Sequence, residues 1–501
     1  MALAIDDRLP VIVGAGQVVA HWHGNGPSPD PAGLAATAVE RALVDCAGDD
    51  VESLRKQIDA LLCTRLMRDS LPGLDDPDTR FVDLPSAIAS RAGLEVSKRV
   101  YSCVGGEQPQ SLVYEACCDV FAGRHKCVVV TGAEATSAIK QARRNQQPLN
   151  WDLSGSGQSE DRGFGEMIIT PYEFSKGLGL PMFSYALIDH ALRTRYGWSR
   201  DEYRFKVGEF LAGFSAVAAE NEFAYFHDRR TADFLTTASD ENPLITDPFL
   251  KWHMAQDAVN QGAALVVTSV GHARALGIPE RRWVFMHSFA QAKDDAVSHR
   301  ADLSHSRPMQ VVLRHALDQA NVRVEALATL DLYSCFPSVV LLACEYLGID
   351  PLSRPLTVTG GLPFFGGPGN NYALHAIAAT VARCRETPAA AGLVLANGGY
   401  LSKLSAAVYS SAAPTSVDRI FRDAISLEDA SDSVAIDEVA SEASVESFFV
   451  AYGRRGPRFG ALLSRSDRGR ALIQVENAQT LQRLSEVDPI GKPVSEFWSD
   501  A

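Results

Sequence analysis

The sequence has no C-x-x-C pair, although it contains nine cysteines. Most of these cysteines stand inside apolar helix-like or strand-like patterns. That placement favours buried free thiols in a reducing cytoplasm over disulfides or a zinc site. No apolar run approaches the ~18 residues of a membrane span, and the first residues hold no basic segment followed by a cleavable apolar stretch. We therefore expect a cytoplasmic protein with no signal peptide, no membrane span and no bound metal.

Positive charge is also in short supply. Lys and Arg number 47 against 61 Asp and Glu, which gives a formal net charge of -14. This balance argues against nucleic acid or an anionic membrane as a partner, but it leaves room for a small anionic ligand held by a local basic site. The hydrophobic content of 46% and the charged content of 22% are typical of a globular protein, and 501 residues can form more than one domain.

The clearest local pattern is the stretch YSCVGGEQPQSLVYEACCDVFAGRHKCVVVTGAEA, residues 101–135. It predicts the end of a strand, a glycine turn, a helix, a short loop and a buried strand. Such a turn presents a side chain at a helix N-terminus, where the helix dipole and free backbone N–H groups lower the pKa of a thiol. This elbow contains Gly105, Gly106, Glu107 and Gln108 but no obvious nucleophile, and Cys103 lies three residues before Gly106.

The same order of elements occurs twice along the chain. A helix followed by a strand is predicted over 33–65 and again over 306–336. Each pair is followed by a glycine turn that opens a helix and then by a strand, over 101–135 and over 357–400. Strands that alternate with helices favour sheets covered by helices on their faces. We therefore predict an α/β core of two pseudo-symmetric halves.

Two regions depart from this repeat. Residues 136–245 begin with a polar, Gly/Ser-rich run and continue with helical patterns, and we interpret them as a lid-like insertion, because long structured insertions are usually functional. Residues 417–501 contain alternating runs separated by Gly and Arg turns, which is typical of a small antiparallel β-domain.

Four segments in order resemble the thiolase superfamily over roughly 10–412. The elbow with VVVTGAEA is similar to the nucleophile loop of that family. YSCFPSVVLLACEYLG (333–348) is similar to its N-E-A-F segment, or to the H-D-C-F segment of the sterol-carrier-type branch. TVTGGLPFFGGPG (357–369) is similar to the N-x-N-G-G…G-H-P loop, and VLANGGYLSK (394–403) to the loop bearing the second catalytic cysteine.

The resemblance implies a thiolase-like fold followed by a small OB-like β-barrel. That combination is similar to the type 1 group of thiolase-like proteins, often described as acetyl-CoA acetyltransferases. The implied division is a first half over 1–270 that includes the lid 136–245, a second half over 271–412, and the β-domain over 417–501. Classical thiolases are dimers or tetramers that pair the strand before the elbow. Here that strand, KRVYSC, starts with two basic residues, and no oligomeric state is predicted.

Position by position, the family's catalytic side chains are replaced. The nucleophilic cysteine falls on Gly106, the histidine of G-H-P on Gly367, and the second cysteine on Ala396. The asparagine or histidine of the N-E-A-F or H-D-C-F segment falls on Tyr333. Thiolysis by the usual covalent route is therefore not predicted.

Four residues remain as catalytic candidates: Tyr333, Glu107, Asn397 and Cys103. Thiolase-fold aldolases carry a tyrosine in the same Y-x-C-F setting as a proton donor or acceptor, which a tyrosine can be when its pKa is lowered. Their second tyrosine would fall on Gly367, with Tyr372 five residues further on.

Each candidate also has a purely structural interpretation. Tyr333 would be a buried, hydrogen-bonded tyrosine, and Glu107 a favourable charge in the first helical turn. Asn397 would form a turn or donate to a thioester oxygen, and Cys103 would be a small buried strand residue, the reading we favour. Cys335 would fill the core or line the pocket.

Glycines form the second group of site residues, because they let the backbone approach a ligand closely. Two helix starts with free N–H groups would still bind a thioester oxygen. The group comprises Gly105, Gly106, Gly360, Gly361, Gly366, Gly367, Gly398 and Gly399.

Three functions stay open, all with a coenzyme A thioester as ligand and no covalently bound cofactor. The first is an acyltransferase-type enzyme without the cysteine pair, and the second is a C–C lyase that uses Tyr333. The third is a non-catalytic protein that binds acyl-CoA, or binds a protein partner through its C-terminal β-domain. The basic run KQARR (140–144) would contact the phosphates of coenzyme A or simply be solvated.

Overall fold

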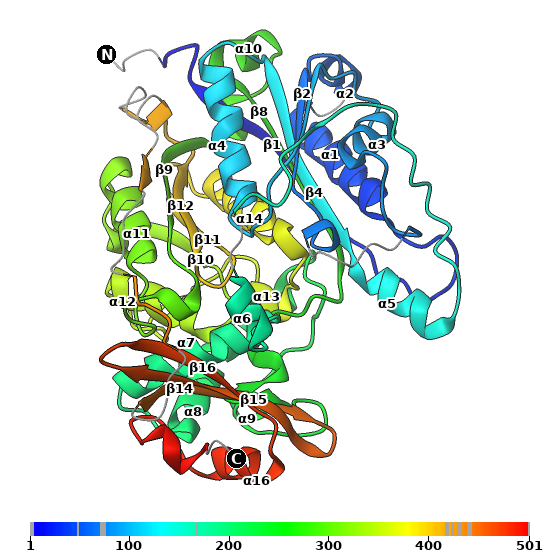
Figure 1. The fold of residues 1–501 in the computed structure, drawn as a ribbon. Helices are drawn as coiled ribbons and strands as arrows, with labels where there is room; N and C mark the ends of the chain where they lie inside the picture. Colours follow the sequence, from blue (N-terminus) through cyan, green and yellow to red (C-terminus); the bar gives the residue numbers. More distant parts are fainter. Residues whose placement is uncertain are drawn as a thin grey trace.

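The computed structural model describes residues 5–47, 50–70, 77–166, 169–415, 420–421, 425–427, 433–437 and 443–498. Its strands form three sheets (Figure 1). None of the helices in this part of the chain combines the length and the apolarity that a bilayer crossing needs. The same residues contain no group of three or more His, Cys, Asp or Glu side chains placed to hold a metal ion.

The first sheet has the strand order β1-β8-β4-β2-β3-β5. Its strands are β1 (Pro10–Val19), β2 (Ala60–Cys63), β3 (Lys98–Tyr101), β4 (Cys127–Ala135), β5 (Glu160–Asp161) and β8 (Asn260–Ser269). β4 pairs in parallel with β2, and every residue of β4 is buried. Such burial on both faces explains the uninterrupted apolar run at the start of β4.

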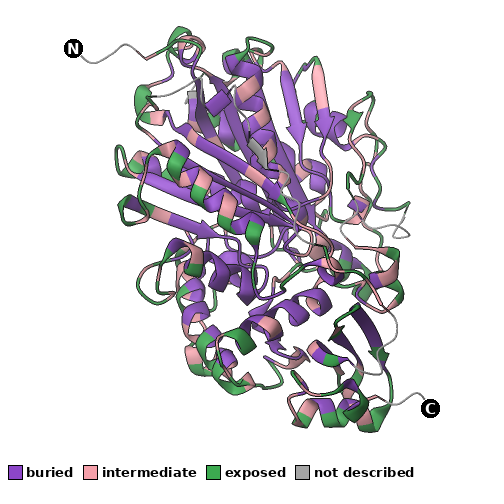
Figure 2. Cartoon of the chain, turned by 60° about the vertical axis from the view of Figure 1, so that its left-hand side comes forward, coloured by how far each residue is buried: buried purple, intermediate pink, exposed green. Residues whose placement is uncertain are grey.

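The second sheet has the order β10-β11-β12-β9-β13. Its strands are β9 (Phe285–Lys293), β10 (Leu327–Leu332), β11 (Ala391–Gly398), β12 (Lys403–Ser410) and β13 (Ile425–Leu427). β10 and β11 are parallel neighbours, and β11 turns back into the antiparallel β12. The central strands β4 and β8 of the first sheet and β11 and β12 of the second are almost entirely buried (Figure 2).

Helices separate and cover the two sheets. The elbow helix α4 (Gln108–Phe121) and its counterpart α14 (Tyr372–Glu386) pack on each other between the sheets, while α1 (Pro31–Ala47) and α11 (Arg307–Ala320) cover the outer faces (Figure 1). A Cβ built on Gly14 or Gly16 would collide with the backbone of α1, so glycine lets this helix lie directly on β1. The predicted α/β core of two similar halves is confirmed.

The insertion after β4 is mostly helical. Its elements are α5 (Thr136–Asn145), α6 (Pro171–Ser175), α7 (Pro181–Arg195), α8 (Arg200–Glu220), α9 (Ala232–Thr236), β6 (Leu244–Thr246) and β7 (Phe249–Leu250). Ser199 and Glu202 form a reciprocal capping box that starts α8. The strand β5 lies in the same region and pairs in parallel with β3, so the chain covers the edge of its own first sheet.

The third sheet joins the insertion to the C-terminus, in the order β16-β15-β14-β6-β7. Its C-terminal strands are β14 (Ser444–Gly453), β15 (Gly456–Ser466) and β16 (Gly469–Val475), followed by α16 (Ala478–Glu486). Ala451 pairs with Thr246, and the Asp247 nitrogen donates to the Val450 carbonyl at 2.9 Å. The C-terminal strands are antiparallel, as predicted. The described residues show an open sheet that includes two strands of the insertion. Closure of these strands into a barrel stays a prediction.

Candidate functional site

Three candidate side chains meet where strands of the second sheet end and the elbow helix begins. Tyr333 directly follows β10, Asn397 stands at the end of β11, and Glu107 immediately precedes α4. Because β10 and β11 are parallel neighbours, their carboxyl ends lie at the same edge of the sheet. The fold thereby brings Tyr333, Asn397 and Glu107 together.

The hydroxyl of Tyr333 occupies the space over the elbow. A Cβ built on Gly106 would collide with the Tyr333 Oη and with the Asn397 carbonyl oxygen. Tyr333 is 5% exposed and contacts the ring of Tyr372 edge-on, with ring centroids 5.3 Å apart. Burial, reinforced by Cys335 and Glu107, raises the pKa of Tyr333 well above its ordinary value, so the side chain is a protonated phenol.

Glu107 is not a solvated charge in the first turn of the helix. Its side chain caps no backbone N–H group and is 4% exposed. Its Oε1 accepts a hydrogen bond from Gln108 Nε2 at 2.8 Å, while its Oε2 has no partner among the described residues. A Cβ built on Gly105 or on Gly398 would run into this carboxylate. Burial raises the pKa of Glu107, and the positive charge of Lys403 opposes that shift.

Asn397 is held by a residue that the sequence analysis missed. Its Nδ2 donates to the Tyr185 Oη at 2.7 Å and to the Cys335 Sγ at 3.4 Å, and its Oδ1 has no partner within the described part of the chain. Tyr185 lies on α7, and its Oη also accepts from the Leu401 nitrogen at 2.9 Å and donates to the Gly399 carbonyl at 3.3 Å. The Asn397 Oδ1 and the Glu107 Oε2 are thus two buried acceptors without a partner in the described part of the chain.

Lys403 is a second residue that the analysis missed, although it ends the quoted VLANGGYLSK segment. It is 6% exposed, and its Nζ donates to the carbonyls of Glu166 at 3.1 Å and Val104 at 3.4 Å. It also lines a cavity of about 230 Å³ whose wall includes Lys293 and Asp294. A buried lysine ending a glycine turn is a signal that a search for charged residues at strand ends would have found.

Comparison with known proteins places the chain in a family. No family model and no curated protein matches it. Among solved structures, it is similar to a monomeric SCP2-thiolase like protein type 1 from Mycobacterium smegmatis, with 32% sequence identity and a TM-score of 0.80. The match covers 97% of this chain and 96% of that chain. The chain belongs to the SCP2-thiolase-like protein type 1 family.

More distant structures share the fold of this SCP2-thiolase-like protein. An acetyl-CoA acetyltransferase from Syntrophomonas wolfei has 17% identity and a TM-score of 0.57, over 82% of this chain and 100% of that one. The Ltp2-ChsH2(DUF35) aldolase has 18% identity and a TM-score of 0.58, over 80% of this chain and 98% of that one. The expected thiolase-like fold is confirmed.

Cys103 of the SCP2-thiolase-like protein lies two residues after the end of β3, not on a strand as expected. It is half-buried, and its Sγ donates to the Arg162 carbonyl at 3.5 Å. A Cβ built on Gly165 would come within 3.1 Å of this sulfur. The Cys103 thiol therefore packs against residues 162–165, which follow β5.

Most of the remaining glycines pack against protein atoms. A Cβ built on Gly360, Gly361 or Gly366 would collide with Ala218, Phe214 or Gln261, in that order. Gly367, where the family histidine was expected, donates its N–H to the Gln256 carbonyl at 2.8 Å. Close packing against neighbouring residues therefore explains glycine at 360, 361 and 366. Contact of these glycines with a ligand stays a prediction.

Tyr372 does not supply the second tyrosine of the aldolase pattern. Its Oη donates to the Asp331 Oδ1 at 3.0 Å and shares a hydrogen bond of 2.6 Å with the Thr359 Oγ1. In the basic run 140–144, Lys140 forms an ion pair of 2.6 Å with Asp257. The hydroxyl of Tyr372 is thus hydrogen-bonded to Asp331 of β10 and to Thr359. Contact of the basic run with phosphates stays a prediction.

Proposed function

We propose that this protein is an acyl-CoA-handling enzyme that transfers protons at a carbon–carbon bond, in the manner of a retro-aldol lyase, and does not transfer acyl groups through cysteine. The observation that carries the proposal is the Tyr333 hydroxyl over Gly106, in the space that the family nucleophile would need. The coenzyme A thioester is the substrate, and no covalently bound cofactor takes part.

The site supplies the groups that a retro-aldol step requires. Glu107 Oε2 accepts the proton of a β-hydroxyl group on the substrate, and the bond between the α and β carbons breaks as a carbonyl forms. The electron pair passes to the thioester enolate, and the Tyr333 phenol then protonates its α-carbon. Glu107 returns its proton to the Tyr333 oxygen, so both residues end as they began. Backbone N–H groups of the elbow would hold the enolate oxygen.

The raised pKa values of both residues suit these roles. Burial keeps the Tyr333 phenol protonated until the enolate forms beside it. A raised carboxyl pKa also makes Glu107 a stronger base than an exposed glutamate. The positive charge of Lys403 opposes that shift and so favours the ionised carboxylate, the form that accepts a proton.

The test is a panel of acyl-CoA and β-hydroxyacyl-CoA esters, assayed for release of a carbonyl product. Tyr333→Phe and Glu107→Gln should each lower the cleavage rate by about 10²-fold or more. Tyr409→Phe is the matched control, because Tyr409 is also fully buried and its hydroxyl has no hydrogen-bond partner within the described chain. Equal rates in Tyr333→Phe and Tyr409→Phe would contradict the lyase proposal.

A non-catalytic acyl-CoA binder is the second candidate, because Tyr333 and Glu107 fill the elbow space in this structure. Binding measured by calorimetry without turnover of any ester would favour it. The acyltransferase reading predicts an acyl adduct on Cys103, which intact-protein mass spectrometry and peptide mapping would detect.

We further propose that the protein is monomeric and cytoplasmic. The M. smegmatis relative is described as monomeric, and here β5 occupies the edge of β3 that a second copy would need. All nine cysteines are free, which fits a reducing compartment. Light scattering coupled to size exclusion should give one chain per particle, and a dimer mass would overturn this proposal. The DUF35 partner of the aldolase neighbour suggests testing a protein partner by the same method.

A further inference from the structure

The turn between β11 and β12 carries two residues of the candidate site, one at each end. Asn397 stands on one side and Lys403 on the other, and Gly398 pairs with Lys403 across the turn. Other parts of the chain hold this turn from two directions, and both contacts lead back to the C-terminal sheet.

The first connection runs through α7. Tyr185 on this helix accepts hydrogen bonds from the Asn397 Nδ2 and the Leu401 nitrogen, and it donates to the Gly399 carbonyl. A single hydroxyl thus joins three points of the turn. Tyr185 is 1% exposed, and its ring stacks on Phe336 with centroids 4.1 Å apart, so its position depends on where α7 lies.

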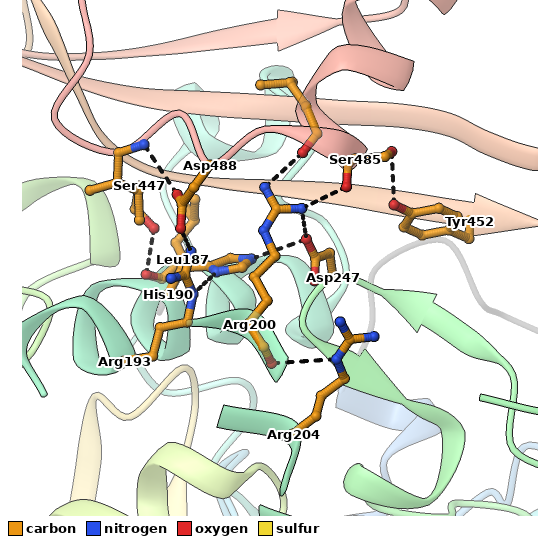
Figure 3. Close-up of polar contacts among 12 residues, drawn as sticks. Leu187, His190, Arg193, Arg200, Arg204, Asp247, Ser447, Tyr452, Ser485 and Asp488 are labelled. Atoms are coloured by element: carbon orange, nitrogen blue, oxygen red, sulfur yellow. Dashed lines mark hydrogen bonds and ion pairs between the residues drawn. The ribbon is translucent and has the colours of Figure 1, made fainter. Parts of the chain in front are cut away.

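Residues 443–498, which carry β14, β15, β16 and α16 and are called the C-terminal domain below, contact other residues of α7 (Figure 3). Ser447 of β14 donates to the Leu187 carbonyl at 2.6 Å, and the ring of His190 stacks on Phe448 at 4.1 Å. Burial and the neighbouring Arg193 keep the pKa of His190 well below its ordinary value, so its neutral Nδ1 accepts from the Arg193 Nε at 2.7 Å.

Arg193 completes this contact with an ion pair of 2.7 Å to Asp488, which follows α16 (Figure 3). Contacts at Leu187, His190 and Arg193 recur at intervals of three residues, so they lie close together along the helix. α7 is therefore fixed by the C-terminal domain while its Tyr185 reaches the turn.

The second connection runs through two buried arginines. Arg300 donates to the Tyr400 carbonyl at 2.6 Å and to the Ser402 Oγ at 3.0 Å. The backbone around Arg300 is in turn held by Arg470 of β16, whose guanidinium bonds to the carbonyls of Arg300, Ser298 and Ala301. Arg470 is fully buried and is paired with Glu446 of β14.

We infer that the C-terminal domain is a positioning element for the site: it fixes the 397–403 turn through Tyr185 on one side and through Arg470 and Arg300 on the other. A role in presenting Asn397 to a substrate rests on the proposed function, whereas the fixing of the turn does not. Tyr185, Arg300 and Arg470 are thus positioning residues that act through Asn397 and its turn.

The test is hydrogen exchange with mass spectrometry on the full chain. Tyr185→Phe and Arg470→Met should each speed exchange of the 397–403 peptide by about tenfold, the effect of losing one or two hydrogen bonds. If Arg470→Met fails to fold, Ser402→Ala interrupts the same connection at the turn. The matched control is Arg483→Met, because Arg483 of α16 donates to the Glu496 carbonyl at 2.8 Å within the C-terminal domain, and in the described part of the chain it contacts neither α7 nor the 397–403 turn.

The inference would be overturned if exchange of the turn were no faster in Tyr185→Phe and Arg470→Met than in Arg483→Met. If a substrate is found, Tyr185→Phe should lower kcat with little change in KM, because it loosens the turn that packs on Gly106 and the Glu107 carboxylate without removing a binding group. Failure to find any lyase activity would refute the proposed function and would leave the exchange result standing.

Discussion

Substituting Gly398 with alanine tests whether the Glu107 carboxylate fills the space between the two glycine turns. A Cβ at this position would collide with the Glu107 Oε2. Gly398 has no positive φ, so the backbone itself accepts alanine. The substitution is therefore limited by the carboxylate and not by backbone strain.

The expected magnitude follows from that one contact. Overpacking in a filled core costs about 1–3 kcal/mol of unfolding free energy. In a Glu107→Ala background the nearest remaining atom is the Gly106 nitrogen at 3.0 Å. There the change should lie within about 1 kcal/mol of neutral, because alanine restricts the unfolded chain while its Cβ still lies close to this nitrogen. The coupling between the two sites should thus be on the order of 2 kcal/mol.

Urea titration of four proteins measures this coupling: wild type, Gly398→Ala, Glu107→Ala and the double variant. Gly213→Ala is the control, because a Cβ there would meet nothing within 4 Å, and its effect should not depend on Glu107. The same loss of stability from Gly398→Ala in both backgrounds would refute the placement of the carboxylate.

Two further predictions concern the elbow and a buried acid. Gly106→Cys should not restore acyl transfer and should destabilise the protein by about 1–3 kcal/mol, because its Cβ would collide with Tyr333; an acyl adduct on this cysteine in a variant of wild-type stability would contradict this. Burial raises the pKa of Glu134 from 4.5 to about 8, so its effect on stability is most favourable below pH 4.5 and is lost as the pH rises to about 8. Glu134→Gln should flatten the stability profile over that range, and identical profiles for both proteins would exclude Glu134 as the cause.

The layered core could be predicted because its signals are local. Residues 101–135 and 357–400 each carry an apolar run, a glycine turn and a helix within one short stretch, and these reappear as the two elbow units. Tyr333 and Asn397 could be named as candidates because each stands in a segment that resembles a thiolase motif, whereas their meeting at the ends of parallel strands is seen only in the structure.

The third sheet and the pairing of β5 could not be predicted. β5 and β7 have two residues each and β6 has three, too few to show a period of two. Their partners are also distant in sequence: Thr246 pairs with Ala451, and Asp161 with Tyr101. A pattern confined to neighbouring residues contains no information about such pairs.

The surroundings of the site were equally hidden. The sequence correctly marked Glu107 as standing at the start of a helix, but whether its carboxylate faces water or the glycine turns depends on Gly398, almost three hundred residues away. Tyr185, Arg300 and Arg470 belong to three separate segments, and none stands in a motif that marks it. Only the tertiary packing brings them to one turn.

The sharing of strands between the insertion and the C-terminus has a consequence for biosynthesis. β6 begins at Leu244 and β14, on which it pairs, begins at Ser444, so β6 leaves the ribosome well before its partner. Throughout synthesis of the second half, β6 therefore presents an unpaired edge, a state that favours wrong association. A nascent chain that has not yet reached β14 lacks this partner of β6, so the insertion gains that strand neighbour only after β14 has been made.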